Sequence, residues 1–328
     1  MKIAVTGSIA TDHLMTFRGR FRDSLVVEQL DKISLSFLAD ELEIRRGGVA
    51  ANIAFGMANL GLHPALVGSV GEDFSDYRSW LERHGVDCES VHVSDSRHTA
   101  RFVCTTDDDM AQIATFYAGA MSDARLIELQ PIAHRLGGLD LVLIGANDPQ
   151  AMLRHTEECR TREIPFIADP SQQLAFADGP EIRRLIDGAA YLFTNEYEAH
   201  LTEQKTGWSG DDILKRVGTR IVTRGSDGVD ILRQGEPTIH VPVAREVRKA
   251  DPTGVGDAFR AGFMTGLAGG LGLRRCAELG SMLATYVIET VGTQEYQLRQ
   301  EAFLSRLSAA YGPESAAEIA PVVSCRHG

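Results

Sequence analysis

The sequence predicts an α/β fold with three layers, in which helices cover both faces of a mostly parallel central sheet and a small β lid is attached. Short apolar runs recur along the chain, amphipathic helical stretches separate them, and two further segments show period-two patterning instead. With 328 residues, of which 44% are hydrophobic and 24% charged, the chain can bury a sizeable core.

The predicted core strands are short apolar runs that end at or next to Gly, Asn or Asp. Between them lie helical stretches such as "NIAFGMANLG" from Asn52 and "EIRRLIDGA" from Glu181. Strands that alternate with helices form parallel sheets, and ligands of such sheets sit beyond the carboxyl ends of the strands. Polar residues directly after the runs are therefore the first candidates for a site. The runs are "KIAVTG" (2–7), "ALVGSVG" (65–71), "LVLIGA" (141–146), "PFIADP" (165–170), "YLFTN" (191–195) and "RIVTRG" (220–225).

Two segments interrupt this alternation and predict the small β lid. Apolar and polar residues alternate in "KISLSFLADELEIRR" (32–46), which predicts a strand. They also alternate in "RFVCTTDDDMAQIATFYAGA" (101–120), which predicts a hairpin whose turn is "DDD". An edge extension of the main sheet would explain both segments equally well. The predicted domains are a large α/β domain of residues 1–12, 47–96 and 121–328, and a lid of residues 13–46 and 97–120.

Composition excludes several classes of function. The net charge of -12 argues against nucleic acid or an anionic membrane as the main partner. No apolar run approaches the eighteen or so residues of a membrane span, and the N-terminus has the pattern of a strand, with an apolar run shorter than that of a signal peptide. The 5 cysteines are scattered and include no CxxC pair, which predicts a reducing, cytoplasmic setting without disulfides or a zinc site.

The stretch "KADPTGVGDAFRAGF" (249–263) carries the strongest local signal for a site. It resembles the start of a GxGxxG fingerprint, but Phe259 occupies the third glycine position, and no lysine in the chain follows a glycine as a Walker loop requires. The small and apolar residues after Asp257 predict a buried helix, whose N-terminal N–H groups can bind an anion. Asp257 is explained either as a carboxylate that stabilises the helix dipole or as a base that accepts a proton from an attacking hydroxyl.

"DPTGVGDAFRAGF" resembles the C-terminal signature of the ribokinase-like (PfkB) family of sugar and nucleoside kinases. The other family landmarks follow the family order over nearly the whole chain; they are "GSIATD", "RRGGVAANIAFGMANLG", "TNEYE" and "VTRGSDGVDIL". Pro252 replaces a usual Thr or Ser, and Val255 a usual Ala or Ser. Neither change removes a backbone donor from the turn that would bind the anion. The resemblance implies a ribokinase-like fold and an ATP-dependent phosphotransferase that uses Mg²⁺.

The resemblance also implies roles for the residues around the glycine turn and the first strand. Asp257 would be the general base, while the backbone at Gly254, Val255 and Gly256 would stabilise the transferred phosphoryl group. Asp12 would accept hydrogen bonds from two sugar hydroxyls, although a turn cap explains it too. Gly48 would let the backbone approach the sugar, and Asn52 would bind a ribose hydroxyl or be an ordinary polar residue of a first helical turn.

The resemblance also implies that further residues contact ATP and its metal. Asn195 and Glu198 form the NxxE pattern, in which Glu198 would act on Mg²⁺ through water; a solvated helix carboxylate is the alternative. The turn after a late strand would contact ATP, although its sequence also suits a plain hairpin. The implied ATP-binding residues are Asn195, Thr223, Arg224, Gly225, Ser226, Asp227, Gly228, Thr253, Gly254 and Gly256.

The predicted lid and the loop after "PFIADP" bear on the acceptor. Phe102 and Phe116 lie on the two arms of the predicted hairpin, where they could stack on a purine or form the hairpin's own small core. Gln172 and Gln173 carry both donors and acceptors, which suits an adenine edge, or they belong to a surface loop.

A narrower resemblance, to actinobacterial adenosine kinases, implies the acceptor itself. It rests on "AVTGSIATDHL", "GANDP", "ADPSQQ" and "DPTGVGDAFRAGF". It implies phosphorylation of adenosine at O5′ in purine salvage, with Ser8 and Met121 also beside the nucleoside. A ribokinase- or fructokinase-like sugar kinase is the alternative, followed by a non-catalytic nucleoside-binding protein and, more remotely, an NAD-dependent dehydrogenase. Period-two residues Ile33, Leu35 and Phe37 predict pairing of lid strands in a homodimer.

Overall fold

The computed structural model describes residues 1–24 and 36–325, and its centre is an eight-stranded sheet. Six of its strands run parallel, and two antiparallel strands extend one edge, which confirms the predicted mostly parallel sheet. In spatial order the strands are β14 (Ile239–Val241), β13 (Val229–Leu232), β12 (Thr219–Thr223), β11 (Tyr191–Asn195), β10 (Phe166–Asp169), β9 (Leu141–Gly145), β1 (Ile3–Thr6) and β4 (Ala65–Val67).

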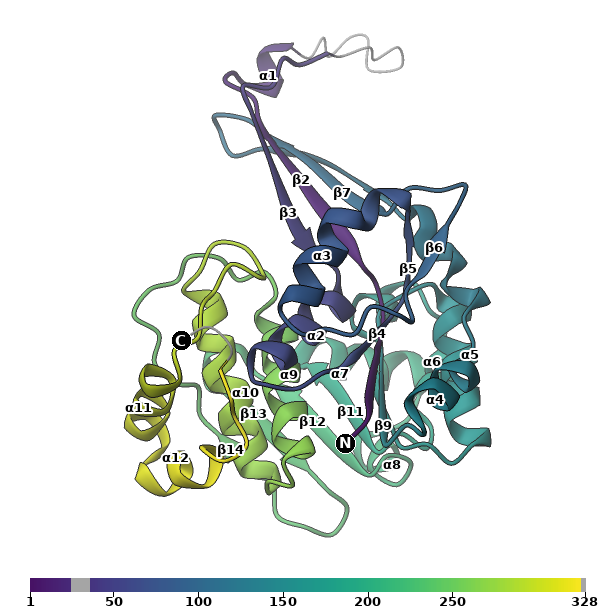
Figure 1. Ribbon diagram of the computed structural model, residues 1–328, viewed down its shortest axis with the longest axis vertical. Helices are drawn as coiled ribbons and strands as arrows, with labels where there is room; N and C mark the ends of the chain where they lie inside the picture. The colour runs from purple at the N-terminus through teal and green to yellow at the C-terminus, as the bar shows by residue number, and fades with distance from the viewer. Residues whose placement is uncertain (25–35, 326–328) are drawn as a thin grey trace.

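Successive side chains of the central strands enter two different cores, one on each face of the sheet. Val5, Leu143 and Phe193 belong to one buried cluster, while their neighbours Val142 and Leu192 belong to the other. Helices pack on both clusters, which produces the predicted three layers (Figure 1). On the first face lie α2 (Val49–Asn59), α3 (Ser75–Arg83), α9 (Val255–Ala268), α10 (Leu273–Ile288), α11 (Gln300–Tyr311) and α12 (Pro313–Ile319); on the second lie α4 (Leu129–Leu136), α5 (Pro149–Thr161), α6 (Gly179–Ile186), α7 (Glu196–Thr206) and α8 (Gly210–Leu214).

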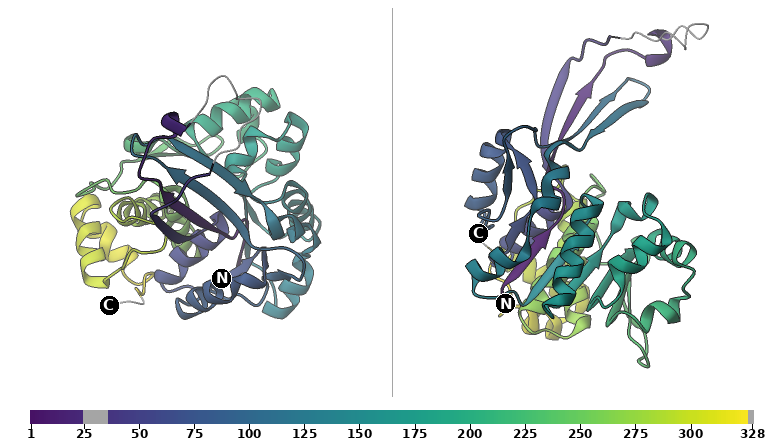
Figure 2. Two further views of the ribbon diagram at one scale, coloured as in Figure 1. Left: turned by 90° about the horizontal axis from the view of Figure 1, so that it is seen from above. Right: turned by 90° about the vertical axis from the view of Figure 1, so that its right-hand side faces the viewer.

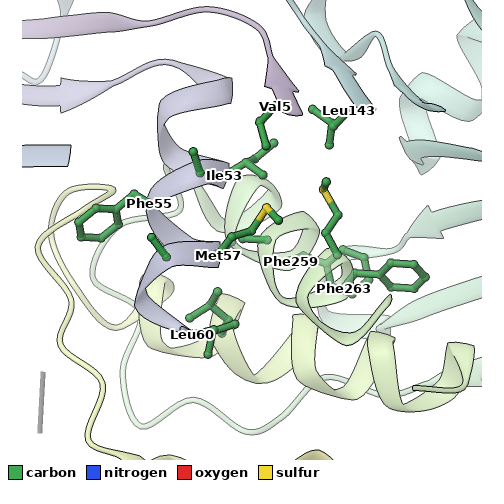
Figure 3. Packing of buried hydrophobic residues seen from close by; sticks show 14 of the residues in the cluster. Val5, Ile53, Phe55, Met57, Leu60, Leu143, Phe259 and Phe263 are labelled. Carbon is green, nitrogen blue, oxygen red and sulfur yellow. The ribbon is translucent and has the colours of Figure 1, made fainter. Parts of the chain in front are cut away.

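Helix α9 is the buried helix that the glycine-rich stretch predicts. Its apolar side chains Phe259 and Phe263 belong to the same buried core as Val5 and Leu143 (Figure 3). Gly262 permits the close approach of α10, because a Cβ there would lie 2.7 Å from the Cα of Gly280. This packing fixes the N-terminus of α9 on the side of the sheet where the parallel strands end.

A second sheet of four strands projects from the large domain (Figures 1 and 2). We call this sheet the lid. Its strand order is β3-β2-β7-β8, and β7 and β8 form the predicted hairpin, so the alternative of an edge extension of the main sheet is excluded. The strands are β2 (Ala10–Thr16), β3 (Glu41–Gly47), β7 (Ala100–Thr106) and β8 (Gln112–Tyr117); the remaining elements are the short helix α1 (Phe21–Ser24), the paired strands β5 (Ser69–Gly71) and β6 (His92–Ser94), and the 3₁₀ turns Glu72–Phe74, Gly119–Leu126, Ser171–Ala175 and Gly225–Asp227.

Two strand predictions are wrong in detail. "ALVGSVG" is two strands in different sheets, because the chain bends at Gly68, where a Cβ would lie 2.8 Å from the Gly7 carbonyl oxygen. Lid strand β3 begins at Glu41, because its partner β2 ends at Thr16, the residue paired with Glu41, so residues 36–40 of the predicted strand are not part of it. Residues 32–35 of that prediction lie outside the described residues. Phe37 packs against Phe17 and Phe21 with ring centroids 4.9 Å apart in both pairs. Ile33 and Leu35, on which the dimer prediction partly depends, lie outside the described residues.

Across residues 1–24 and 36–325, no helix has both the length and the apolar character that crossing a membrane requires.

Candidate active site

Two cavities meet at the N-terminus of helix α9. The first, of about 480 Å³, lies between the carboxyl ends of the central strands and the lid, and Gly254 and Asp257 line it. The second, of about 350 Å³, lies on the other side of the same turn, and Val255 and Gly256 line it. We call them the acceptor cavity and the donor cavity. Both volumes fall within the range of about 300–1,000 Å³ that small-molecule sites occupy.

Every residue predicted to contact the acceptor lines the acceptor cavity. They come from distant parts of the chain: the loop after β1, strand β2, the start of α2, the lid hairpin, the 3₁₀ turn Gly119–Leu126, the turn after β10 and the first turn of α9. Such convergence at the carboxyl ends of parallel strands is what the fold class leads one to expect. The predicted residues are Ser8, Asp12, Gly48, Asn52, Phe102, Phe116, Met121, Gln172, Gln173 and Asp257.

Asp257 is a half-buried carboxyl in the first turn of α9. Burial raises its pKa to about 6, while a hydrogen bond from Asn52 and the charge of Arg260 oppose that rise. Asn52 Nδ2 donates to Asp257 Oδ2 at 2.9 Å. A carboxyl with this pKa is mostly ionised at neutral pH and is a stronger base than an ordinary aspartate, so it is suited to accept a proton.

A buried ion pair lies behind Asp257. Arg260 Nη2 donates to Asp169 Oδ1 at 2.7 Å, and Arg260 Nη1 donates to the carbonyl oxygen of Gly256 at 3.0 Å. Both charged side chains are almost completely removed from solvent. The pair therefore ties the first turn of α9 to the carboxyl end of strand β10, which holds the turn between the two cavities in place.

Asp12 is the second carboxyl of the acceptor cavity. Burial raises its pKa to about 6, although the positive charge of Arg45 counteracts this. It lies on β2 opposite Arg45 of β3, at the base of the lid. An ionised carboxyl that is short of solvent gains most from new hydrogen-bond donors, which vicinal sugar hydroxyls would supply.

The glycine positions around the acceptor cavity are required by the backbone. Gly48 has φ +96°, and a Cβ there would lie 2.6 Å from the Ser8 carbonyl oxygen. Gly254 has φ +76°, and a Cβ there would lie 2.9 Å from the Thr293 side chain. Both values lie where L side chains are strained, so each glycine allows a turn that brings backbone groups to the cavity wall.

Phe102 and Phe116 face each other across the lid hairpin, as directly paired residues of β7 and β8. Both line the acceptor cavity, and Phe116 is 53% exposed. A side chain this exposed is not part of a packed hairpin core, so Phe116 does not fit that alternative, whereas Phe102 is half-buried. Large exposed aromatic side chains at a cavity wall provide apolar area for a flat ligand.

The predicted ATP-binding residues divide between the two cavities. Thr223, Gly225, Ser226, Gly228 and Gly256 line the donor cavity, whereas Thr253 and Gly254 line the acceptor cavity. The N–H of Thr253 donates to Asp251 Oδ1 at 2.9 Å, and that of Val255 donates to the carbonyl oxygen of Pro252 in a long bond of 3.4 Å. The N–H groups of Gly254 and Gly256 are therefore the better placed to bind a ligand.

Three predicted ATP-binding residues line neither cavity. Arg224 pairs with Glu196 at 2.9 Å and with Asp230 at 2.8 Å. Asn195 caps helix α7, where its side chain accepts from the N–H of Glu198. Asp227 lies in the turn before Gly228 but is absent from the lining of the donor cavity. Their contribution to ATP binding stays a prediction.

Glu198 could take part in holding a metal only together with other ligands. Burial raises its pKa, and its Oε2 accepts from the backbone N–H of Asn195 at 2.8 Å. Within the described residues, no cluster of three or more His, Cys, Asp or Glu side chains could bind a metal ion by itself. A single carboxylate fits the way in which Mg²⁺ is bound with phosphate, since the ion keeps several of its waters.

The sequence missed several residues of both cavities. Asn147 follows β9, so the rule that identified Asp12 could have found it; Phe176 and Thr293 carry no comparable signal. In the donor cavity the missed residues come from the segment after β14 and from helix α10. They are Val243, Ala244, Glu246, Lys249, Ser281, Ala284, Thr285 and Ile288, together with Val229, Pro252 and Phe259.

Comparison with known proteins identifies the family to which this arrangement belongs. Residues 10–300 match the pfkB family carbohydrate kinases. The chain belongs to this family. Its ribokinase-like fold and its membership of the family make it an ATP-dependent phosphotransferase, as the resemblance implied.

Several relatives of the pfkB family are similar over most of their length. A nucleoside kinase of Burkholderia thailandensis, solved in complex with inosine, has a TM-score of 0.82 and 35% identity, covering 94% of this chain and 99% of that one. The nucleoside kinase of Methanothermobacter thermautotrophicus is 32% identical over 274 residues, which are 82% of this chain and 86% of that protein. The nucleoside kinase of Methanocaldococcus jannaschii is 28% identical over 295 residues, 89% of this chain and 92% of that protein.

Proposed function

We propose that this protein is a nucleoside kinase that transfers the γ-phosphoryl group of ATP to the 5′-hydroxyl of adenosine. The observation that carries the proposal is the position of the α9 N-terminus between two cavities, with Asp257 facing one and the backbone of Val255 and Gly256 facing the other. Two substrates can therefore approach the same helix end from opposite sides, as a direct transfer between them requires.

The residues divide the work of transfer in the following way. The 5′-hydroxyl oxygen attacks the γ-phosphorus, its proton passes to Asp257, and the bond between the γ-phosphorus and the oxygen that leaves with ADP breaks, which yields AMP and ADP. The free N–H groups and the dipole at the start of α9 stabilise the negative charge on the transferred group. The closely packed helix pair α9 and α10 keeps these donors in place.

Asp12, Gly48 and Asn52 are the proposed sugar-binding residues. They line the part of the acceptor cavity that also contains Asp257, so hydroxyls bound there would place a neighbouring primary hydroxyl near the base. Ser8 Oγ accepts from the N–H of Val49 at 3.0 Å, which holds the turn before α2 against the cavity.

Two glutamines support a purine as the base of the nucleoside. Gln173 Nε2 donates to the carbonyl oxygen of Asn147 at 2.9 Å, which leaves its Oε1 as an acceptor. Gln172 Oε1 accepts from Ser171 Oγ at 2.8 Å, which leaves its Nε2 as a donor. One free acceptor beside one free donor matches the amino group and N1 of adenine.

The same pair of groups also matches hypoxanthine, the base of inosine, which presents one donor and one acceptor at its edge. Because the relative from Burkholderia thailandensis was solved with inosine, inosine is the second candidate acceptor. The aromatic lining supports a nucleoside over a bare sugar, because Phe102 and Phe116 of the lid and Phe176 of the large domain offer apolar area that a free pentose would leave uncovered.

Mg²⁺ would be bound by the phosphates of ATP, with Glu198 contributing through a water molecule. When bound, the ion neutralises phosphate charge and helps to orient the group that is transferred. The place of the protein in metabolism would then be purine salvage, since the reaction returns a free nucleoside to the nucleotide pool.

A side-by-side substrate panel tests the proposal. Adenosine, inosine, guanosine, cytidine, ribose and fructose are each offered with ATP and Mg²⁺, and ADP release and nucleoside monophosphate formation are measured. We expect adenosine to have the highest kcat/KM. If ribose or fructose is phosphorylated far better than any nucleoside, the protein is a sugar kinase. If adenosine raises the melting temperature but no ADP is released with any acceptor, it is a binding protein.

We also propose that two copies pair through their lids. Strand β3 is an edge of the lid sheet, and its Leu42 and Ile44 are each 58% exposed. An apolar edge strand is stabilised when a second chain covers it. Light scattering coupled to gel filtration should give a dimer mass for the wild-type protein and a monomer mass for Leu42→Lys; a monomer in both cases would contradict the proposal.

A further inference from the structure

A buried chain of hydrogen bonds runs from Trp80 to Asp257 through two amide side chains. Trp80 Nε1 donates to Gln294 Oε1 at 3.2 Å, and Gln294 Nε2 donates to Asn52 Oδ1 at 2.9 Å. Asn52 Nδ2 then donates to Asp257 Oδ2 at 2.9 Å. Gln294 is only 1% exposed, so water does not compete for these bonds. Its Nε2 also donates to the hydroxyl oxygen of Tyr77 at 2.6 Å.

This chain has one possible direction. The indole N–H of Trp80 can only donate, so Gln294 must present its oxygen to Trp80 and therefore its NH₂ group to Asn52. Asn52 must then present its oxygen to Gln294 and its NH₂ group to Asp257. Thr293 Oγ1 also lies 3.0 Å from Asn52 Oδ1, but its single hydrogen is shared with the carbonyl oxygen of Arg46 at 2.9 Å, so Gln294 supplies the other donor that fixes the amide. Without these donors the two orientations of an amide differ little in shape, and either could face the carboxylate.

We propose that Gln294 is a positioning residue for phosphoryl transfer, which holds the Asn52 amide with its NH₂ group toward Asp257. This inference rests on the proposed role of Asp257 as general base. Asn52 occupies Asp257 Oδ2, so the other carboxylate oxygen stays available for the proton of the acceptor hydroxyl. If the Asn52 amide turned over, its oxygen would face the carboxylate and repel the ionised form that catalysis needs.

The Gln294 side chain is hydrogen-bonded to none of the charged groups that surround Asp257, so its effect on the pKa of Asp257 can be separated from theirs. The charged or titratable groups around the carboxyl are Arg260 on α9, Asp169 at the end of β10, Tyr296 after α10, and Asp12 across the cavity. The Gln294 side chain is hydrogen-bonded to Trp80, Asn52 and Tyr77 instead. Replacing it therefore changes the electrostatics of Asp257 through Asn52.

The sign of the effect follows from the bond that is lost. A donated hydrogen bond stabilises the ionised carboxylate and lowers its pKa, so losing it raises the pKa of Asp257. The base must be ionised to accept a proton. The acid limb of the profile of kcat/KM against pH should therefore move to higher pH, and activity should recover in alkaline buffer.

The experiment compares Gln294→Met with Tyr77→Phe. Methionine keeps the length of glutamine but cannot donate to Asn52, whereas Tyr77→Phe removes a hydroxyl from the same network and leaves the bond between Gln294 and Asn52 intact. Profiles of kcat/KM are recorded with the best nucleoside acceptor from about pH 5 to about pH 9. We expect the acid limb of Gln294→Met to move up by about half a unit to one unit, and that of Tyr77→Phe to coincide with the wild-type limb.

A double-mutant cycle provides the second readout. In an Asn52→Ala background Gln294→Met should have little further effect on kcat/KM, because the path from Gln294 to Asp257 is already broken. If Gln294→Met does not fold, Trp80→Phe is the substitute variant, because it removes the N–H that fixes the orientation of the Gln294 amide. It should move the acid limb to higher pH as well, by less than Gln294→Met would.

Three results would overturn the inference. One is a uniform loss of activity at every pH in Gln294→Met, which a merely structural role would cause. Another is an equal movement of the acid limb in Tyr77→Phe, and the third is full additivity in the cycle. A wild-type protein that phosphorylates sugars and not nucleosides would refute the proposed function alone, and the pH profiles could still be measured with the sugar.

Discussion

The acceptor cavity and the donor cavity share one helix end but are built in different ways. The acceptor cavity contains two carboxyls of raised pKa and a hydrogen-bonded Asn52, all held in defined orientations. The donor cavity is lined mainly by apolar side chains and turn backbone, and its charged residues Glu246 and Lys249 pair with each other at 3.3 Å. The difference indicates where the protein itself supplies the chemistry.

A physical reason accounts for this division. Under the proposed function, ATP would bring its own phosphate charges and its metal, so the donor cavity would need mainly a surface for the nucleotide and a few N–H donors. The acceptor is an unactivated alcohol, so the protein must supply both the base and the geometry of attack. The substitutions below test this contrast, from the largest expected effect to the smallest.

Asp257→Asn should have the largest effect, a loss of about 10²- to 10⁴-fold in kcat. The amide has nearly the same shape as the carboxyl but cannot accept the proton of the attacking hydroxyl. ADP release in a coupled assay measures the loss, and the melting temperature and the adenosine affinity by calorimetry serve as controls. Near-normal turnover by Asp257→Asn would show that the acceptor cavity does not supply the base through Asp257.

Phe116→Ala should weaken the use of nucleosides selectively. Stacking of a base on an aromatic side chain contributes about 1–3 kcal/mol, so kcat/KM for adenosine should fall roughly tenfold to hundredfold. The KM for ATP should stay within about twofold, because Phe116 lines the acceptor cavity. Phe176→Ala is the matched comparison: Phe176 lines the same cavity but is 82% exposed, so its loss should matter less.

Ala284→Phe is the converse of Phe116→Ala. Ala284 of helix α10 lines the donor cavity. A phenyl ring at this position would fill part of the cavity in which we propose that the nucleotide binds. We expect the KM for ATP to rise about tenfold while the KM for adenosine changes little. Initial rates with each substrate varied in turn measure both values. Equal changes in the two KM values would mean that the cavities are not separate binding sites.

The smallest of the expected effects is the change in stability that Asp12→Asn should cause. Burial raises the native pKa of Asp12 to about 6, so its stabilising contribution is fully present below its ordinary pKa and is lost as the pH rises through 6. Above pH 6 the ionised carboxyl costs stability, which the neutral amide avoids. The melting temperature of the variant should exceed that of the wild type by about 2 °C at pH 8, and the difference should vanish near pH 4.

Calorimetric scans at the two pH values measure this effect, while adenosine phosphorylation should fall because a sugar-binding group is lost. A variant that is less stable at pH 8 would show that hydrogen bonds from Asp12 outweigh the cost of its burial.

The sequence by itself determined the class of the fold and most of the acceptor cavity. Apolar runs separated by amphipathic stretches predict a parallel sheet, and residues such as Asp12 and Gln173 lie within a few positions of the ends of those runs. Because the ends of parallel strands converge, a local rule is sufficient to bring such residues together. The small residues of α9 similarly predict its burial, since only small side chains allow the close approach of α10.

Only the tertiary structure decided which residues complete the donor cavity and hold the base. Val243 and Ala284 are apolar residues without a motif, and they meet only because α10 packs against α9 and β14. Gln294 is separated from Asn52 by 242 positions, and nothing local distinguishes it from an exposed loop glutamine. Its proposed role depends on burial and on the direction of its hydrogen bonds, and both are properties of the folded chain.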